Sequence, residues 1–260
     1  MRKRLRNCLI AAGLAVAVVI PAAAPAEAAP RSATVRALAF DWTTLAIEVA
    51  KQLLAGSGSD DSALRAAVQQ IINAVDAAKN DIIAHTDLIA AADVQACARQ
   101  HTIEFTDIEN MSNAVRQLWA QQATACETLA TAYVNTLTTS QAVDNIGYVL
   151  PSLFAIVIAA RGRAGLTNGI NLVIQDQIRS YEAVVTKLTP TNCVRKGIKD
   201  VDTPPERWWE CTAYNGVVGY SEPVYAPTPP DRAQAEDNAT RSTSRPPLKA
   251  ALPPLRALGV

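Results

Sequence analysis

Hydrophobic residues recur every three or four positions over a long central stretch of the chain. The recurring positions are Leu64, Val68, Ile71, Val75, Ala78, Ile82, His85, Ile89, Ala92 and Ala96. Such spacing is typical of one face of a helix that packs against other helices. The 88 residues from Ser59 to Ile146 contain neither glycine nor proline, which favours long helices over a many-stranded sheet. We therefore predict a long amphipathic helix, with Asp60 and Asp61 at its start.

A second stretch with helical spacing runs from Ile108 to Ala132, and the chain has to reverse before it. Two observations place the turn differently. Residues 106–109 (Thr-Asp-Ile-Glu) match a capping box, which would start the second helix near residue 107. A disulfide between Cys97 and Cys126 would instead centre an antiparallel helical hairpin on residues 110–113. We expect the reversal between residues 104 and 113.

Three further helices complete the predicted bundle. One covers Phe40 to Leu54, and another follows Asn168-Gly169 and ends before Pro190. Between them, the 15 residues from Ile146 to Ala160 carry no charge. Because proline is tolerated in a first helical turn, we expect that helix to begin near Pro151. The fold class is therefore predicted as all-α, an antiparallel bundle of about five helices over residues 35–190.

The pattern changes to strands and turns after Pro190. Two short β-prone segments flank Asn215-Gly216, which predicts a type I′ hairpin. We assign residues 191–225 to a disulfide-tied β-hairpin appendix. Eight prolines follow in the last 40 residues, and we predict that residues 226–260 form a disordered Pro-rich tail.

The first 28 residues have the features of a secretory signal peptide. Four basic residues precede a short apolar run, and the small-residue stretch after it ends in Ala26-Glu27-Ala28. The apolar run is too short for a membrane span. We therefore expect residues 1–28 to be removed and the protein to be secreted.

Four cysteines remain after this predicted cleavage: Cys97, Cys126, Cys193 and Cys211. An even number in an exported chain indicates disulfides, and the spacings match no zinc motif. Three pairings are possible. We expect the pairing of sequence neighbours, Cys97 with Cys126 and Cys193 with Cys211, because it needs the least rearrangement of the chain.

The sequence contains no recognisable catalytic, cofactor or metal motif. The basic and acidic residues cancel at 24 each, which argues against a nucleic-acid partner. The only histidines are His85 and His101. His101 and Glu104 share a helix face and could form a metal or acid–base site, but a solvated pair is the more common arrangement. Asp200-Val201-Asp202 lacks the rest of a calcium loop. We expect no enzyme activity, no cofactor and no metal.

The uncharged segment 146–160 has two interpretations. It is either a core helix surrounded by others or a segment that inserts into a membrane through Phe154, Ile156, Val157 and Ile158. Runs of this length are more often core, so we favour the core helix.

Aromatic residues gather near the predicted hairpin, and we select four of them as a candidate binding site: Trp208, Trp209, Tyr214 and Tyr220. Alternation along a strand places Trp208 and Trp209 on opposite faces, one packed on the bundle and one toward water. Exposed aromatic side chains bind partners, although a small hairpin also needs apolar residues to dock. We expect a secreted binding or envelope-interaction protein whose partner is an extracellular protein, a glycan or a lipid surface. The alternative is a membrane-active helical protein, and the sequence leaves the oligomeric state undetermined.

Overall fold

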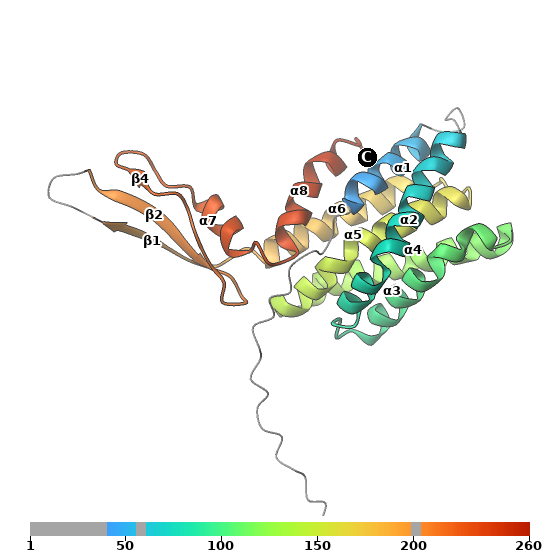
Figure 1. Ribbon diagram of the computed structural model, residues 1–260, viewed down its shortest axis with the longest axis horizontal. Helices are drawn as coiled ribbons and strands as arrows, with labels where there is room; N and C mark the ends of the chain where they lie inside the picture. The colour runs from blue at the N-terminus through green and yellow to red at the C-terminus, as the bar shows by residue number, and fades with distance from the viewer. Residues whose placement is uncertain (1–40, 56–60, 199–203) are drawn as a thin grey trace, which may run out of the picture. The chain divides into compact units, whose positions relative to one another are not determined.

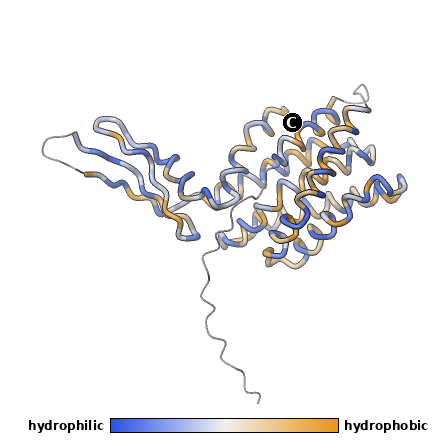
Figure 2. Tube along the Cα trace, in the orientation of Figure 1, coloured by the Kyte–Doolittle hydropathy of each residue, from blue (hydrophilic) through white to orange (hydrophobic). Residues whose placement is uncertain are grey.

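The computed structural model describes residues 41–55, 61–198 and 204–260 (Figure 1). The predicted signal peptide, the predicted helix cap at Asp60 and the Asp200–Asp202 segment lie outside the described residues. The fold is mostly helical with a small antiparallel sheet, which confirms the helical class. Figure 2 shows hydrophobic and hydrophilic residues alternating along the helices, as amphipathic packing requires.

Six α-helices lie in the described part of the region in which we predicted about five. They are α1 (Trp42–Leu54), α2 (Asp61–Thr86), α3 (Ala92–Glu104), α4 (Asn113–Thr136), α5 (Ser140–Arg163) and α6 (Ile170–Lys187). The additional helix arises because the long predicted helix is interrupted after Thr86. The amides of Leu88 and Ile89 there donate to the carbonyls of His85 and Thr86 in a tight turn. Ile89 is buried within this turn, so the hydrophobic spacing continues through the break and conceals it.

The reversal between α3 and α4 lies within the predicted range. A 3₁₀ helix, η2 (Phe105–Asn110), follows α3, and Ser112 caps α4 by accepting a hydrogen bond from the amide of Val115. The cap therefore agrees with the disulfide argument and not with the capping box at 106–109. Cys97 and Cys126 are joined as predicted, which ties α3 to α4.

Helix α5 is the central element of the bundle. It contacts α1, α2, α3, α4, α6 and the C-terminal helix α8 (Arg245–Arg256). The helix begins at Ser140, and Pro151 lies in its interior, so the predicted start at Pro151 was wrong. An interior proline costs a helix about 3 kcal/mol. Burial of nearly every side chain from Ile146 to Ala160 offsets this cost.

The sheet contains more than the predicted hairpin. Its strands are β1 (Asn192–Ile198), β2 (Glu206–Thr212), β3 (Val218–Tyr220) and β4 (Val224–Tyr225). All pairs are antiparallel, with β1 along one side of β2 and with β3 and β4 both paired to β2. Cys193 lies directly opposite Cys211, and the predicted disulfide joins them.

The β2–β3 connection is a three-residue loop and not the predicted two-residue type I′ turn. The amide of Gly216 donates to the carbonyl of Ala213, and the amide of Ala213 donates to the carbonyl of Val217. Gly216 has a φ of 81°, the left-handed conformation that closes three-residue hairpin loops.

The prediction of a disordered tail over residues 226–260 was wrong. Helix α7 (Arg232–Ala239) packs on β2 and β3, and α8 packs on α6 and α1 (Figure 1). The prolines at positions 246 and 247 lie in the first turn of α8, where they need no amide partner. Leu248, Leu252 and Leu255 recur with helical spacing and are buried. Composition alone indicated disorder because it does not register this spacing.

Candidate functional site

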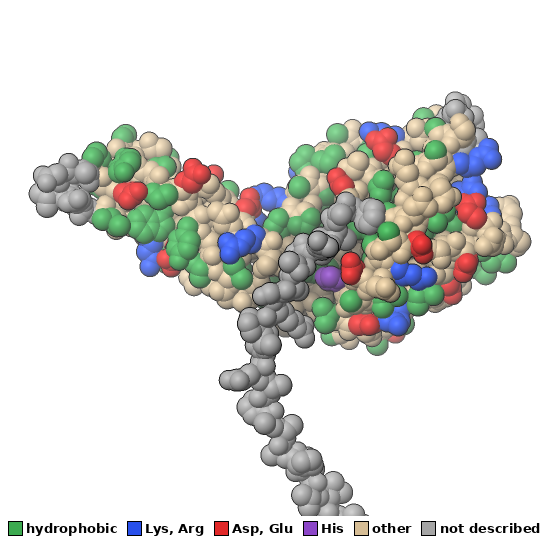
Figure 3. Space-filling model, in the orientation of Figure 1, with side chains coloured by type: hydrophobic (Ala, Val, Ile, Leu, Met, Phe, Trp, Pro, Cys, Tyr) green, Lys and Arg blue, Asp and Glu red, His purple; other side chains and the backbone are tan. Residues whose placement is uncertain are grey.

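The two faces of the sheet differ in what covers them. On one face, Trp209, Cys211 and Ala213 pack against Ala235 and Ala239 of α7. Side chains alternate along β2, so Trp208 and Glu210 point to the opposite face. Several of the hydrophobic residues on that opposite face are strongly exposed. Figure 3 shows hydrophobic side chains gathered over the sheet.

The strand register places Trp208 at the centre of a group that we name the Trp208 face. Glu210 pairs with Val194 on one side and with Tyr220 on the other, and Glu206 pairs in the same way with Ile198 and Tyr225. Four hydrophobic residues therefore lie diagonal to half-buried Trp208: Val194, Ile198, Tyr220 and Tyr225. These four expose between 43% and 59% of their surface.

The charged residues of the Trp208 face are partly neutralised by each other. Lys196 lies opposite Trp208 and forms an ion pair with Glu210, at 3.7 Å between Nζ and Oε1. The group spans about 13 Å along β2, the length of four strand residues. The surface has an aromatic residue at its centre and combines exposed hydrophobic side chains with the charged Lys196, Glu206 and Glu210.

Trp209, a predicted binding residue, does not belong to this face. It packs on α7, and the guanidinium of Arg232 lies 5.6 Å from the centre of its ring. Arg195 on β1 lies opposite it, and Arg207 precedes it by two residues on the same face. We predicted that one of the two tryptophans would pack on the bundle. Trp209 is the packed one, but it lies against α7 and not against the bundle. Sequence reasoning could not identify α7 because we assigned those residues to a disordered tail.

Tyr214 also lies apart from Trp208, at the hairpin loop. Its hydroxyl donates to Oδ2 of Asp144 on α5, at 2.5 Å. Asp144 is buried, and its other oxygen accepts from the amide and the hydroxyl of Ser244, each at 2.7 Å. Burial and the neighbouring Asp144 carboxylate raise the pKa of Tyr214 above its ordinary value. The tyrosine therefore stays protonated and joins the hairpin to α5.

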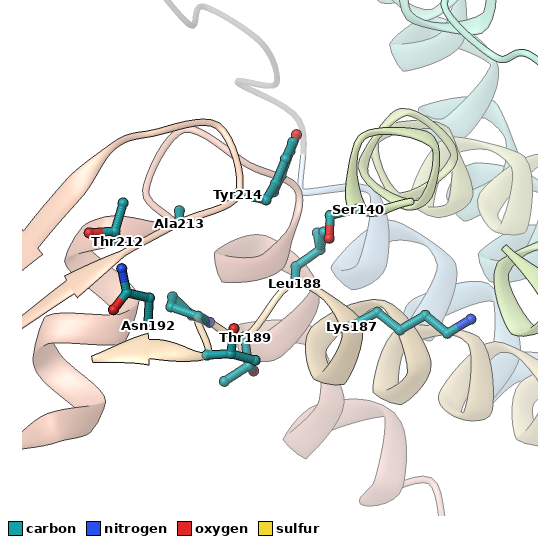
Figure 4. A pocket seen from close by; sticks show the side chains of 10 residues that line it. Ser140, Lys187, Leu188, Thr189, Asn192, Thr212, Ala213 and Tyr214 are labelled. Atoms are coloured by element: carbon teal, nitrogen blue, oxygen red, sulfur yellow. The ribbon is translucent and has the colours of Figure 1, made fainter. Parts of the chain in front are cut away.

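A pocket of about 280 Å³ lies where α6 leads into the sheet (Figure 4). Its polar lining is mostly uncharged: Ser140, Thr189, Thr191, Asn192, Thr212 and Tyr214. The side chain of Lys187 points away from the strands in Figure 4, and its ammonium donates to three carbonyls at the end of α4, those of Val134, Asn135 and Leu137. This pocket can hold polar groups, but its lining offers no acid–base pair.

The four membrane-insertion candidates, Phe154, Ile156, Val157 and Ile158, are completely buried in α5. Among the described residues, α5 is the one helix long and apolar enough to cross a membrane. Within its most apolar 18-residue window, 83% of the residues are buried inside the protein. The arrangement corresponds to the core-helix interpretation.

The two histidines lie in separate structural environments. Nδ1 of His85 lies 2.9 Å from the carbonyl oxygen of Asp81. His101 is buried edge-on against Trp119, whose indole donates to Glu104. Burial lowers the pKa of His101, and the nearby Glu104 carboxylate opposes this effect. In the part of the chain that the structure describes, no three His, Cys, Asp or Glu side chains form a potential metal site.

One titratable group in the core was not anticipated from the sequence. Glu127 on α4 is fully buried, and its Oε1 accepts a hydrogen bond from Thr131 at 3.3 Å. Thr131 in turn lies 2.7 Å from Ser180 of α6, oxygen to oxygen. Burial, followed by the charge of Asp176, raises the pKa of Glu127 to about 8. The helical spacing gave no signal for it, because the second predicted helical face omitted this position.

The fold and the site define a disulfide-linked, mainly helical protein with a small sheet that is covered by α7 on one face. No family model matches the chain, and neither the curated proteins nor the solved structures show a match to it. Its function is therefore argued from its own residues.

Proposed function

We propose that this chain is a secreted, non-enzymatic binding protein that holds an extracellular protein partner on the Trp208 face. The observation that carries the proposal is the contrast between the two faces of the sheet. One is covered by α7, whereas the other exposes Val194, Ile198, Tyr220 and Tyr225 around Trp208. A group of exposed hydrophobic side chains on one uncovered face favours an interaction site.

The residue types on the face favour a protein over a glycan or a lipid surface. Tryptophan and tyrosine are enriched at the centres of protein interfaces, where a few residues supply most of the binding energy. The aliphatic Val194 and Ile198 extend the aromatic centre, and the ion pair with Glu210 engages the ammonium of Lys196 that an anionic headgroup would need.

Secretion is supported by two separate features. The N-terminal sequence has basic residues, a short apolar run and then small residues, which is the order typical of a signal peptide. The chain also has two disulfides, and such bonds form and persist in oxidising compartments outside the cytoplasm.

Site-specific photocrosslinking tests the proposal. A photoreactive phenylalanine replaces Tyr220 on the Trp208 face or, as a matched control, Leu172 of α6, which is 63% exposed on the bundle. The purified chains are irradiated in the growth medium of the producing organism. We expect position 220 to trap a defined protein, position 172 to trap none, and Trp208→Ala to abolish the product while helical circular dichroism is unchanged.

Three results contradict a protein partner. Equal products from positions 220 and 172 would show that the contact is nonspecific. No product from position 220 would remove the protein partner. Sedimentation with insoluble polysaccharide or with lipid vesicles that depends on Trp208 would replace the protein with a glycan or a lipid surface.

Membrane insertion of α5 is the second candidate function. The length and low polarity of α5 favour insertion. Insertion would require Phe154 and Ile156 to leave the centre of the bundle, where both are fully buried. Dye release from anionic and zwitterionic vesicles at neutral and acidic pH tests this. The binding proposal predicts no release, and release by the folded, oxidised chain would favour insertion.

A further inference from the structure

Among the described residues, no strand pairs with the outer side of β1, so the sheet has a free edge there. This strand stands at the end of the strand order, and the run of five residues from Val194 to Ile198 is exposed without a break. Edge strands present unpaired amides and carbonyls that can hydrogen-bond to another chain. An extended peptide can therefore be added to such an edge as a further strand.

The hydrogen-bond pattern of β2 shows which groups of β1 point outward. On the β3 side, the amide of Ser221 donates to the carbonyl of Trp209, and Ala213 bonds to Val217, so the odd-numbered residues of β2 face β3. The even-numbered residues therefore bond to β1. Cys193 and Cys211 are 4.1 Å apart at Cα, as expected for a pair without mutual hydrogen bonds. The backbone groups of Cys193, Arg195 and Gly197 consequently point to the free edge.

The side chains beside this edge differ between the two faces of the sheet. Val194 and Ile198 extend the Trp208 face toward it. On the other face lie Arg195 and Arg207, with Arg232 over the neighbouring Trp209. Arg195 has no ion-pair partner among the described residues. An added strand would therefore meet Val194 and Ile198 on one face, with Lys196 between them engaged by Glu210, and arginines on the other.

We infer that β1 accepts an extended acidic segment of the protein partner, in which acidic and apolar residues alternate. The inference rests on the proposed function, because it names the part of the partner that the sheet holds. The apolar side chains of the segment lie beside Val194 and Ile198, and its carboxylates face Arg195 and Arg207. Alternation is required because successive side chains of a strand point to opposite faces.

A second copy of this chain is a poorer occupant of the same edge. Full antiparallel overlap of two β1 strands would place Arg195 opposite the same residue of the other copy. Like charges directly opposite each other destabilise a sheet. The positive charge of Arg195 therefore favours an acidic partner strand over a second copy of β1.

Binding of synthetic peptides to the full oxidised chain tests the inference. The probe is a heptapeptide of alternating glutamate and valine, the length of β1. Its controls are the lysine–valine peptide and a peptide in which the same glutamates and valines are in two blocks. We expect only the alternating acidic peptide to bind and to slow amide exchange at Cys193, Arg195 and Gly197.

Two variants of one residue identify the edge. Arg195→Pro removes an outward amide without removing a β1–β2 hydrogen bond, and it should weaken peptide binding about tenfold. Arg195→Glu keeps the amide and should reverse the preference toward the lysine–valine peptide. Trp208→Ala, which lies one strand away, should change peptide affinity less than threefold while it abolishes crosslinking from position 220.

The outcomes separate the inference from the proposed function. If position 220 traps a protein but the acidic peptide does not bind, or binds Arg195→Glu equally well, the edge inference is wrong and the proposed function stands. If the peptide binds and crosslinking fails, the edge site exists without the Trp208 face. A dimer of the wild-type chain that Arg195→Pro converts to a monomer, without peptide binding, would assign the edge to a second copy.

Discussion

Replacing the buried Glu127 by glutamine should remove a large pH dependence from the stability of the bundle. The carboxyl of Glu127 ionises near pH 4.5 in the unfolded chain and at about 8 in the folded protein, where burial is the main cause. Between these values the folded state holds one more proton than the unfolded state. Raising the pH there lowers the free energy of unfolding by about 1.4 kcal/mol per pH unit. Over the whole interval the loss is about 5 kcal/mol.

Glutamine keeps the shape of the side chain and an acceptor for Thr131, but it carries no ionisable proton. We therefore expect Glu127→Gln to match the wild-type stability near pH 5 and to exceed it progressively up to pH 8. His101 adds a separate effect, because its lowered pKa makes both chains lose stability as the pH falls below 6.5. The difference between variant and wild type cancels that effect.

Urea unfolding followed by circular dichroism at several pH values measures this difference. Glu182→Gln is the matched control, since Glu182 lies on the surface of α6 and pairs with Arg256. The control should follow the wild-type dependence on pH. If the curves of Glu127→Gln and wild type stay parallel from pH 5 to pH 8, Glu127 is not held protonated in the core and the reasoning fails.

Three further predictions concern the fold. Leu248→Ala should lower the free energy of unfolding by about 2–5 kcal/mol, because Leu248 is fully buried in α8. If urea unfolding shows a change near zero, α8 is not packed and the C-terminal segment is disordered. Joint replacement of Cys97 and Cys126 by alanine should cost about 3–4 kcal/mol in the same assay, since the disulfide closes a span of 29 residues. In Gly219→Ala the new Cβ would lie 2.0 Å from the amide nitrogen of Ala239, so α7 must move away from β3; unchanged amide exchange in α7 would contradict this packing.

The candidate site was only partly predictable from the sequence. Alternation along a strand correctly separated Trp208 from Trp209, because that rule depends only on adjacent positions. It could not group Trp208 with Val194, Ile198 and Tyr225, which come from two other strands, β1 and β4, and meet through the register. Tyr214 was grouped with them by its closeness in sequence, but the loop directs it to Asp144.

The sequence alone determined the helical class, the disulfide pairing and the hairpin around Gly216, because each depends on spacing within one helix, one helical hairpin or one turn. The tertiary structure decided the rest. Packing of α8 on α6 gives the proline-rich segment a buried face, and packing around α5 holds a helix through Pro151. In both places contacts between distant residues outweigh a local preference, since several buried apolar side chains at about 1.5–3 kcal/mol each exceed the about 3 kcal/mol that an interior proline costs.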